Sequence, residues 1–232
     1  MSVQDKKILI VEDDRPIAEL LAYRLEKEGF SVEMALTGSD ALQAVDASEP
    51  DLLLLDWNLP DISGLDICQQ ITQTRKIPII MITAKNLVED KILGLESGAD
   101  DYITKPFDVR EIVARINATF RRLERAPAPP HSENDGVIPF SGLVVNTNSM
   151  LISRDGRAIP TTPLEYHLMM YFYENQDHVL TRDQILDAVW GYEYFGNTRT
   201  VDIHVLRLRK KLDLDKEIQT VFKVGYKFSL QQ

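Results

Sequence analysis

Over its first half the chain alternates short apolar runs with stretches whose apolar residues recur at helical spacing. LLLL at 52–55 and IIMI at 79–82 have no polar side, which is typical of central parallel strands covered by helices on both faces. The pattern predicts strands at 8–11, 32–35, 52–55, 79–82 and 102–104, and helices at 15–28, 39–47, 65–72, 88–97 and 109–122. These units predict an α/β domain with a doubly wound, five-stranded parallel sheet of the flavodoxin-like type.

A polar segment interrupts this pattern. Residues 124–136 read ERAPAPPHSENDG, with three prolines and no apolar periodicity. Such a composition is typical of an exposed, partly extended linker. The sequence therefore predicts two domains, 1–123 and 137–232, joined by a Pro-rich linker at 124–136.

After the linker, the pattern changes to that of a small α+β domain. At 137–159, apolar and polar residues alternate between turn signals, which predicts an antiparallel sheet. Helices at 162–175 and 181–190 each open with a threonine followed three residues later by Glu165 or Gln184, the spacing of a capping box. A loop at 191–197, a third helix at 198–212 and a hairpin at 220–230 around Gly225 complete a predicted winged helix-turn-helix domain.

The third predicted helix has two different faces. One is an apolar stripe for packing: Val201, Val205, Leu208 and Leu212. The opposite face is basic with apolar interruptions: Arg199, Ile203, Leu206 and Lys210, with Arg207 beside them. In a DNA major groove, Ile203 and Leu206 would contact thymine methyls, while Arg199 or Arg207 would reach guanine edges or phosphates.

Charge is distributed unevenly along the 232 residues, whose net charge is −10. Residues 1–125 hold 15 basic and 23 acidic side chains, giving −8, and the remainder holds 11 and 13, giving −2. Within the second part, residues 199–212 carry five basic residues and one acidic residue, so a basic helix lies in an acidic protein. No apolar run is long enough to cross a bilayer, the start lacks a signal-peptide pattern, and Cys68 is the single cysteine. We expect a soluble, cytoplasmic protein with no disulfide and no membrane contact.

Polar residues gather at the predicted strand ends: Glu12, Asp13 and Asp14, then Asp56, Thr83 and Lys105. Converging carboxylates repel one another unless a divalent cation joins them, and few-carboxylate sites suit Mg²⁺. A lysine and a hydroxyl add the charge and the hydrogen-bond donor that a phosphoryl group needs. The sequence thus predicts phosphate chemistry at this edge of the sheet.

The motifs at these positions are similar to those of a known family. ILIVEDD at 8–14, LLLLDWNLPDISG at 52–64, IPIIMITA at 77–84 and GADDYITKPF at 98–107 resemble the CheY-like receiver domain of two-component response regulators. The resemblance implies that Asp56 accepts a phosphoryl group from a sensor histidine kinase. It further implies that Asp13, Asp56 and the backbone carbonyl of Asn58 bind Mg²⁺, that Glu12 acts through water, and that Thr83 and Lys105 hold the phosphoryl oxygens.

The same resemblance implies a switch and a dimer. Thr83 would move toward the phosphoryl group and Tyr102 would turn inward behind it. Phosphorylation would then favour a two-fold receiver dimer through charged residues that this chain retains: Lys91, Asp100, Asp101, Glu111, Arg115 and Arg122.

The second domain resembles the output domain of the OmpR/PhoB subfamily, in TRDQILDAVWG at 181–191, NTRTVDIHVLRLRKKL at 197–212 and VGYKF at 224–228. The resemblance implies a transcription factor rather than an enzyme, with a receiver that assists its own phosphotransfer and dephosphorylation. Its dimer would bind promoter DNA at direct repeats, in the family's manner, with RNA polymerase as a further partner. The implied DNA contacts are Trp190, Arg199, Thr200, Ile203, His204, Leu206, Arg207, Arg209, Lys210, Lys223 and Tyr226.

Two positions depart from the subfamily pattern. Leu206 stands where several relatives carry a basic residue, and Phe222 with Lys223 stands where an Arg-Gly pair is usual. These departures leave minor-groove contact by the wing open, with Lys223 as a candidate substitute for the arginine.

Two other classes of function remain open at this point. A Mg²⁺-dependent phosphatase or nuclease could use similar strand-end carboxylates, but Asn58 lies where a second acidic residue would be expected and no general base is apparent. A regulator that binds DNA constitutively, with the receiver serving only for dimerisation, is the other alternative.

Overall fold

The computed structural model describes residues 6–84, 94, 97–124, 136–191 and 198–230 of the chain. The chain divides into two compact units, Met1–Phe120 and Arg121–Gln232. The predicted domain limits and the linker remain predictions, because residues 125–135 lie outside the described part. Among the residues described, no helix is both long and apolar enough to span a bilayer.

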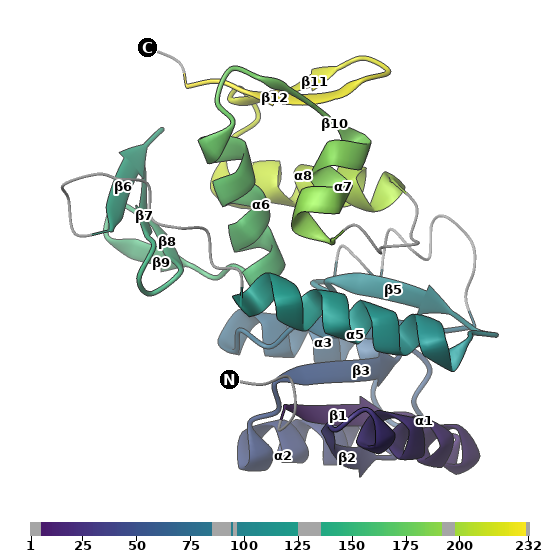
Figure 1. The fold of residues 1–232 in the computed structure, drawn as a ribbon. Helices are drawn as coiled ribbons and strands as arrows, with labels where there is room; N and C mark the ends of the chain where they lie inside the picture. Colours follow the sequence, from purple (N-terminus) through teal and green to yellow (C-terminus); the bar gives the residue numbers. More distant parts are fainter. Residues whose placement is uncertain (1–5, 85–93, 95–96, 125–135, 192–197, 231–232) are drawn as a thin grey trace. The chain divides into compact units, whose positions relative to one another are not determined.

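The first unit is built on one parallel sheet, whose strand order is β2-β1-β3-β4-β5. Its elements are β1 (Lys7–Val11), α1 (Arg15–Lys27), β2 (Ser31–Ala35), α2 (Gly38–Ser48), β3 (Leu52–Asp56), α3 (Gly64–Thr74), β4 (Ile79–Thr83), β5 (Asp101–Thr104) and α5 (Val109–Glu124). Figure 1 shows α1 and α5 on the near side of the sheet and α3 on its far side. This is the flavodoxin-like order, so the predicted α/β fold is confirmed.

The sheet forms because its central strands bury every residue. All five residues of β3 and all five of β4 are buried, as their unbroken apolar runs predict. Each buried leucine contributes about 1.5–3 kcal/mol relative to an exposed one. The elements begin and end within about two residues of their predicted limits, but the helix predicted at 88–97 falls almost entirely outside the described residues.

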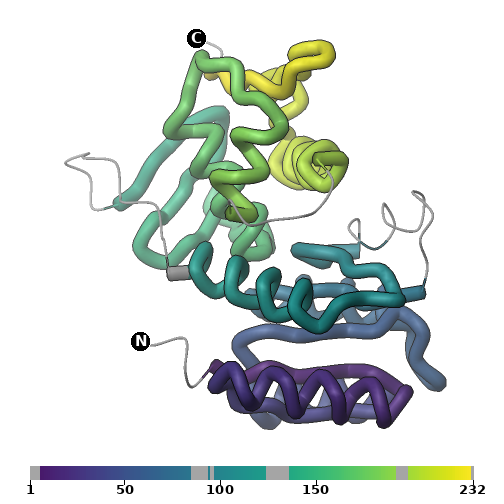
Figure 2. The backbone as a smooth tube through the Cα atoms, turned by 45° about the vertical axis from the view of Figure 1, so that its right-hand side comes forward, coloured from purple at the N-terminus to yellow at the C-terminus, as the bar shows by residue number. Residues whose placement is uncertain are grey.

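Among its described residues, the second unit combines three helices with two antiparallel sheets. One sheet has the order β6-β7-β8-β9 and the other the order β10-β12-β11. Its elements are β6 (Val137–Phe140), β7 (Leu143–Asn146), β8 (Leu151–Arg154), β9 (Arg157–Ile159), α6 (Pro163–Glu174), β10 (Val179–Thr181), α7 (Arg182–Val189), α8 (Arg199–Leu212), β11 (Ile218–Val221) and β12 (Gly225–Phe228). Figure 2 shows the β11–β12 hairpin projecting from the helices of this unit. The predicted winged-helix architecture is confirmed.

Local sequence determines where α6 and α7 begin. Thr162 and Thr181 both accept a backbone N–H from the third helical residue, and Glu165 and Gln184 reach back to the two caps. Both predicted capping boxes are therefore present.

The predicted turn at Gly225 is wrong in one detail. The turn comprises residues 222–224, and Gly225 is the first residue of β12. A Cβ at Gly225 would lie 2.0 Å from the carbonyl oxygen of Leu180. Glycine is required there because β12 approaches β10 closely, not because the chain reverses.

Candidate functional site

An acidic site lies at the carboxyl end of the parallel sheet. Glu12 directly follows β1, and Asp56 is the last residue of β3. Glu12 and Asp56 are buried and Asp13 is exposed, yet one carboxylate oxygen from each lies within 4.8 Å of the others. Three hard oxygen ligands at this spacing fit a small divalent cation such as Mg²⁺.

Lys105 connects the two buried carboxylates. Its Nζ donates to Asp56 Oδ2 at 2.6 Å and to Glu12 Oε1 and Oε2 at 2.7 and 2.8 Å. Burial alone would lower the pKa of Lys105, but the hydrogen bonds and charges of Asp56 and Glu12 outweigh burial and raise it. Burial raises the pKa of Glu12 to about 7, and the negative charge of Asp56 adds to this effect. The hydrogen bond from Lys105 acts in the opposite direction but does not outweigh them. The ammonium therefore keeps Asp56 paired in a site that would otherwise be strongly anionic.

The loop after β3 is fixed from two sides, which positions Asp56. Asp61 accepts the backbone N–H groups of Gly38 and Ser39 at 2.7 and 2.9 Å and the Ser39 hydroxyl at 2.7 Å. The Gly64 N–H donates to the carbonyl oxygen of Trp57 at 2.9 Å. The Asn58 N–H donates to Asp56 Oδ1 at 3.0 Å. Asp56 therefore has both carboxylate oxygens oriented by hydrogen bonds.

Gly64→Ala is expected to destabilise this unit and to displace Asp56. A Cβ at Gly64 would lie 2.1 Å from the Asp56 carbonyl oxygen and 2.9 Å from Trp57 Cα. Backbone atoms cannot move aside as easily as the end of a flexible side chain. We therefore expect a loss of about 1–3 kcal/mol in the free energy of unfolding. Calorimetric unfolding would measure it. Gly142→Ala is the control, since a Cβ there meets nothing within 4 Å and only the left-handed backbone costs about 1 kcal/mol. Equal losses of unfolding free energy in the two variants would show that the backbone does not crowd a Cβ at Gly64.

Thr83 and Tyr102 lie on neighbouring strands near the acidic site. Thr83 ends β4 and is buried, and its carbonyl oxygen accepts the N–H of Lys105 at 2.7 Å. Tyr102 on β5 is only 9% exposed, and a Cβ at Gly94 would lie 3.0 Å from its ring. The tyrosine that the resemblance implies as a switch is thus largely buried and packs close to Gly94.

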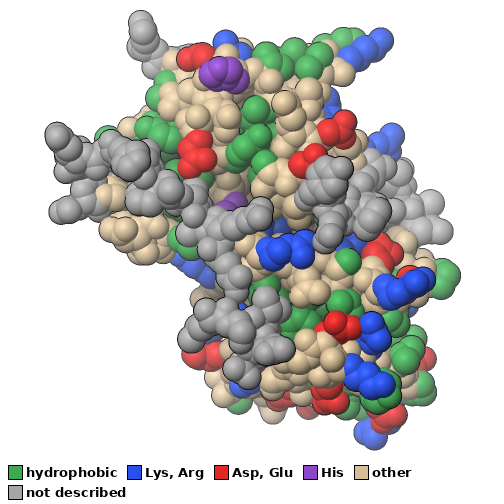
Figure 3. All heavy atoms as spheres, in the orientation of Figure 1, with side chains coloured by type: hydrophobic (Ala, Val, Ile, Leu, Met, Phe, Trp, Pro, Cys, Tyr) green, Lys and Arg blue, Asp and Glu red, His purple; other side chains and the backbone are tan. Residues whose placement is uncertain are grey.

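Four of the residues predicted for a dimer interface make contacts within the described part of the chain: Asp100, Asp101, Glu111 and Arg115. Arg115 Nη1 contacts Asp101 at 2.7 Å, and Arg115 Nη2 contacts Glu111 at 2.6 Å. Asp100 accepts the backbone N–H of Ile79 at 2.9 Å, and Arg122 is buried on α5. Lys91 lies outside the described residues. Figure 3 shows acidic and basic side chains mixed on the drawn face of the first unit.

The third helix of the second unit, α8, has the two faces that the sequence predicts. Val201, Val205, Leu208 and Leu212 have no exposed surface. The opposite face carries the exposed residues Arg199, Leu206 and Lys210, together with the partly exposed Thr200 and Ile203. At 39% exposure, Leu206 leaves much of a leucine side chain in solvent.

Both units match known families. The family model for the response regulator receiver domain matches residues 8–117, and that for the C-terminal domain of transcriptional regulatory proteins matches residues 156–228. Two mutant structures of RitR are 30% and 29% identical, each covering 97% of this chain and 100% of that chain, with TM-scores of 0.79 and 0.82. DrrB, an OmpR/PhoB homologue from Thermotoga maritima, is 33% identical over 97% of this chain and 99% of its own, with a TM-score of 0.51.

The chain belongs to the OmpR/PhoB family of response regulators. Its two domains mark it as a two-component transcription regulator, a DNA-binding transcription factor rather than a classical enzyme.

In this response regulator, four residues predicted to contact DNA are buried. His204 has no exposed surface and packs edge-on against Trp190, with ring centroids 5.1 Å apart. Tyr226 is 4% exposed and donates its hydroxyl to Asp202. Burial, then the hydrogen bond to Asp202, raises the pKa of Tyr226 to about 12. Arg207 is also buried. These positions do not fit direct surface contacts, because His204 packs on Trp190 and Arg207 pairs with Glu165.

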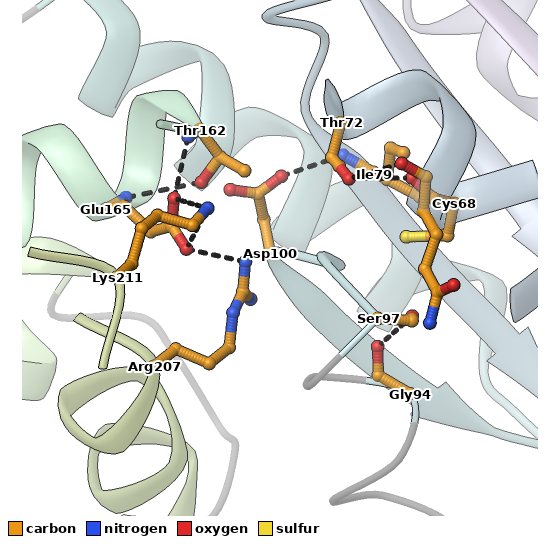
Figure 4. A network of polar contacts seen from close by, with 11 residues as sticks. Cys68, Thr72, Ile79, Gly94, Ser97, Asp100, Thr162, Glu165, Arg207 and Lys211 are labelled. Carbon is orange, nitrogen blue, oxygen red and sulfur yellow. Dashed lines mark hydrogen bonds and ion pairs between the residues drawn. The ribbon is translucent and has the colours of Figure 1, made fainter. Parts of the chain in front are cut away.

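Arg207 instead belongs to an ion network between α6 and α8 (Figure 4). Its Nη2 lies 2.7 Å from Glu165 Oε1, and Lys211 Nζ lies 2.7 Å from Glu165 Oε2. Glu165 also accepts the N–H of Thr162 at 2.9 Å. The sequence indicates Glu165 only as a capping residue. Its second role has no local sequence signal, because Glu165 and Arg207 lie 42 residues apart in the chain.

Arg209 likewise acts within the domain. Its Nε donates to the carbonyl oxygen of Ile218 at 2.8 Å, and its Nη2 donates to Thr220 Oγ1 at 2.9 Å. It therefore connects α8 to β11, the first strand of the wing.

Proposed function

We propose that this regulator is switched by phosphorylation of Asp56 from a sensor histidine kinase. An Asp56 carboxylate oxygen would attack the phosphorus of a phosphohistidine, forming an O–P bond while the P–N bond breaks and the imidazole nitrogen keeps the electron pair. The observation that carries the proposal is the buried Asp56 with both oxygens oriented, by Asn58 and by Lys105.

Lys105 and Thr83 would hold the transferred group. Lys105 already contacts Asp56 and can pair with a phosphoryl oxygen from the same position, and the Thr83 hydroxyl would donate to another. Asp13, Asp56 and Glu12 would hold Mg²⁺, with the Asn58 carbonyl as a further ligand. When bound, the metal would offset the repulsion between carboxylate and phosphoryl oxygens.

The readout would pass through Thr83 and Tyr102 to a receiver dimer. Movement of Thr83 toward the phosphoryl group would favour an inward position of Tyr102. The phosphoryl group supplies nearly two negative charges, which attract the Thr83 hydroxyl. In the dimer, Arg115 would exchange its internal partners, Asp101 and Glu111, for those of a second copy. Phosphorylation biases this equilibrium rather than creating it.

DNA contact is proposed for the exposed face of α8. Arg199 and Lys210 supply positive charge, and Ile203 and Leu206 supply apolar contact for thymine methyls. A dimer would place two such helices in successive major grooves of cytoplasmic promoter DNA, at direct repeats, and RNA polymerase would be the partner there.

Arg199→Ala is expected to weaken DNA binding by the full chain. With duplexes selected by the wild-type chain from a random-sequence pool, we expect a loss of about 1–3 kcal/mol if Arg199 contacts a base, measured by fluorescence anisotropy. The matched control is Arg24→Ala, which removes the same charge from α1, where Arg24 pairs with Glu28 at the surface. Equal affinities of Arg199→Ala and Arg24→Ala would remove Arg199 from the contact surface.

A further inference from the structure

The tip of the β11–β12 hairpin exposes apolar side chains. Phe222 is 81% exposed and Val224 is 43% exposed, and between them lies the exposed Lys223. Figure 3 shows hydrophobic and basic side chains together at the end of this hairpin. A phenylalanine with so much surface in water contributes little to the fold, so its ring is available for a contact outside the domain.

The backbone of the tip holds a cation beside that ring. Lys223 has φ +59°, in the left-handed region, where a glycine would be free of strain and a lysine costs about 1–2 kcal/mol. The Val224 N–H closes the turn onto the carbonyl oxygen of Val221 at 3.0 Å. Lys223 Nζ lies 5.5 Å from the centroid of the Phe222 ring. A side chain kept at a strained position points to a use for its charge.

The tip is also fixed relative to the helix proposed to read DNA. Arg209 on α8 donates to the carbonyl oxygen of Ile218 and to Thr220 Oγ1, both on β11. Tyr226 on β12 donates to Asp202 on α8. Because both strands of the hairpin bond to α8, the tip and the exposed face of α8 would meet the same duplex.

We propose that Phe222 is an apolar wedge that enters the DNA minor groove and partly unstacks a base step, with Lys223 held at the groove by the backbone phosphates. The minor groove is about 6 Å wide, too narrow for a helix, and proteins that bind it frequently insert a single apolar side chain. Its negative potential attracts lysine, and an inserted phenylalanine bends the duplex. Lys223 favours this occupant over an apolar protein surface, because a desolvated ammonium would be costly there. The inference rests on the proposed DNA binding and adds a residue that determines DNA bending and shape preference.

The test compares full-length variants on duplexes that the wild-type chain selects from a random pool. Affinity is measured by anisotropy, and bending by energy transfer between dyes at the duplex ends. Phe222→Ala is expected to weaken binding about tenfold and to reduce the bend, since stacking on a base contributes about 5- to 150-fold. Phe222→Leu should retain most of both. Lys223→Gly keeps the Phe222 ring and relieves the backbone strain. It should reduce by about one the number of counterions released on binding, as read from the salt dependence of the affinity, and leave the bend in place.

The possible results distinguish a failure of this inference from a failure of the proposed function. If the wild-type chain bound no DNA, the proposed function and the wedge would both be wrong. If Phe222→Ala bound and bent DNA as the wild type does, the wedge alone would be wrong. Unchanged DNA binding with lost transcription in Phe222→Ala would also overturn it, because the ring would then contact a protein. Calorimetric unfolding of Phe222→Ala should match the wild type, since the ring is exposed.

Discussion

Asp56→Asn is expected to abolish phosphorylation of the full chain. Incubated with acetyl phosphate and Mg²⁺, the wild type should gain the mass of one phosphoryl group, and the variant should gain none. The physical reason is that an amide oxygen is a poor nucleophile, whereas the buried Asp56 carboxylate is oriented by Lys105 and Asn58. Intact-mass spectrometry measures the gain directly.

The fold should survive this substitution. Asparagine is nearly the same size as aspartate, and its single amide oxygen can still accept from either the Asn58 N–H or Lys105. Removing one carboxylate from a group of three also relieves repulsion, so we expect unfolding of the variant at or above the wild-type temperature. A control is Asp46→Asn, which removes an exposed carboxylate paired with Arg75 away from the site and should leave labelling intact. Full labelling of Asp56→Asn would refute the assignment.

Glu165→Ala is expected to unfold much of the DNA-binding domain. The substitution leaves Arg207 and Lys211 without their shared carboxylate and removes half of the capping box at Thr162. Breaking a buried ion pair by deleting one partner costs about 3–5 kcal/mol, a large part of the about 5–15 kcal/mol that stabilises a domain. DNA binding should be lost with the fold.

Trp190 provides the measurement, because it is buried in this domain and Trp57 is buried in the other. In a Trp57→Phe background, urea unfolding followed by fluorescence reports the DNA-binding domain alone. Glu165→Gln keeps the size and the cap but loses the charge, so its loss should be intermediate. Arg207→Ala should cost less than Glu165→Ala, since Lys211 still pairs with the carboxylate. An Arg207→Ala variant of wild-type stability that binds DNA more weakly would instead restore Arg207 to the DNA contacts.

The sequence predicts the fold well where periodicity alone decides it. The apolar runs of β3 and β4 can only be central strands, and the threonine caps of α6 and α7 determine where those helices begin. The acidic site is predictable for a similar reason. Parallel strands end at one edge of the sheet, so residues at their carboxyl ends must converge.

Prediction is poorer where long side chains choose between partners. Arg207 and Arg209 have the composition of a DNA-binding face, yet one pairs with Glu165 and the other with β11. Their partners are 42 and nine residues away in the chain, and no local pattern specifies such pairing. His204 shows the same limit, since a polar residue can pack on Trp190 as readily as it can face a duplex. Register along the helix, rather than residue type, separates the exposed face from the buried one.

The most direct measurement is the DNA affinity of the full chain with and without acetyl phosphate and Mg²⁺, for the wild type and for Asp56→Asn. The account predicts that the donor tightens wild-type binding by about tenfold, a coupling of about 1.4 kcal/mol, and leaves Asp56→Asn unchanged. Equal wild-type affinity in both conditions, with Asp56 fully labelled, would contradict it and would assign the receiver to constitutive dimerisation.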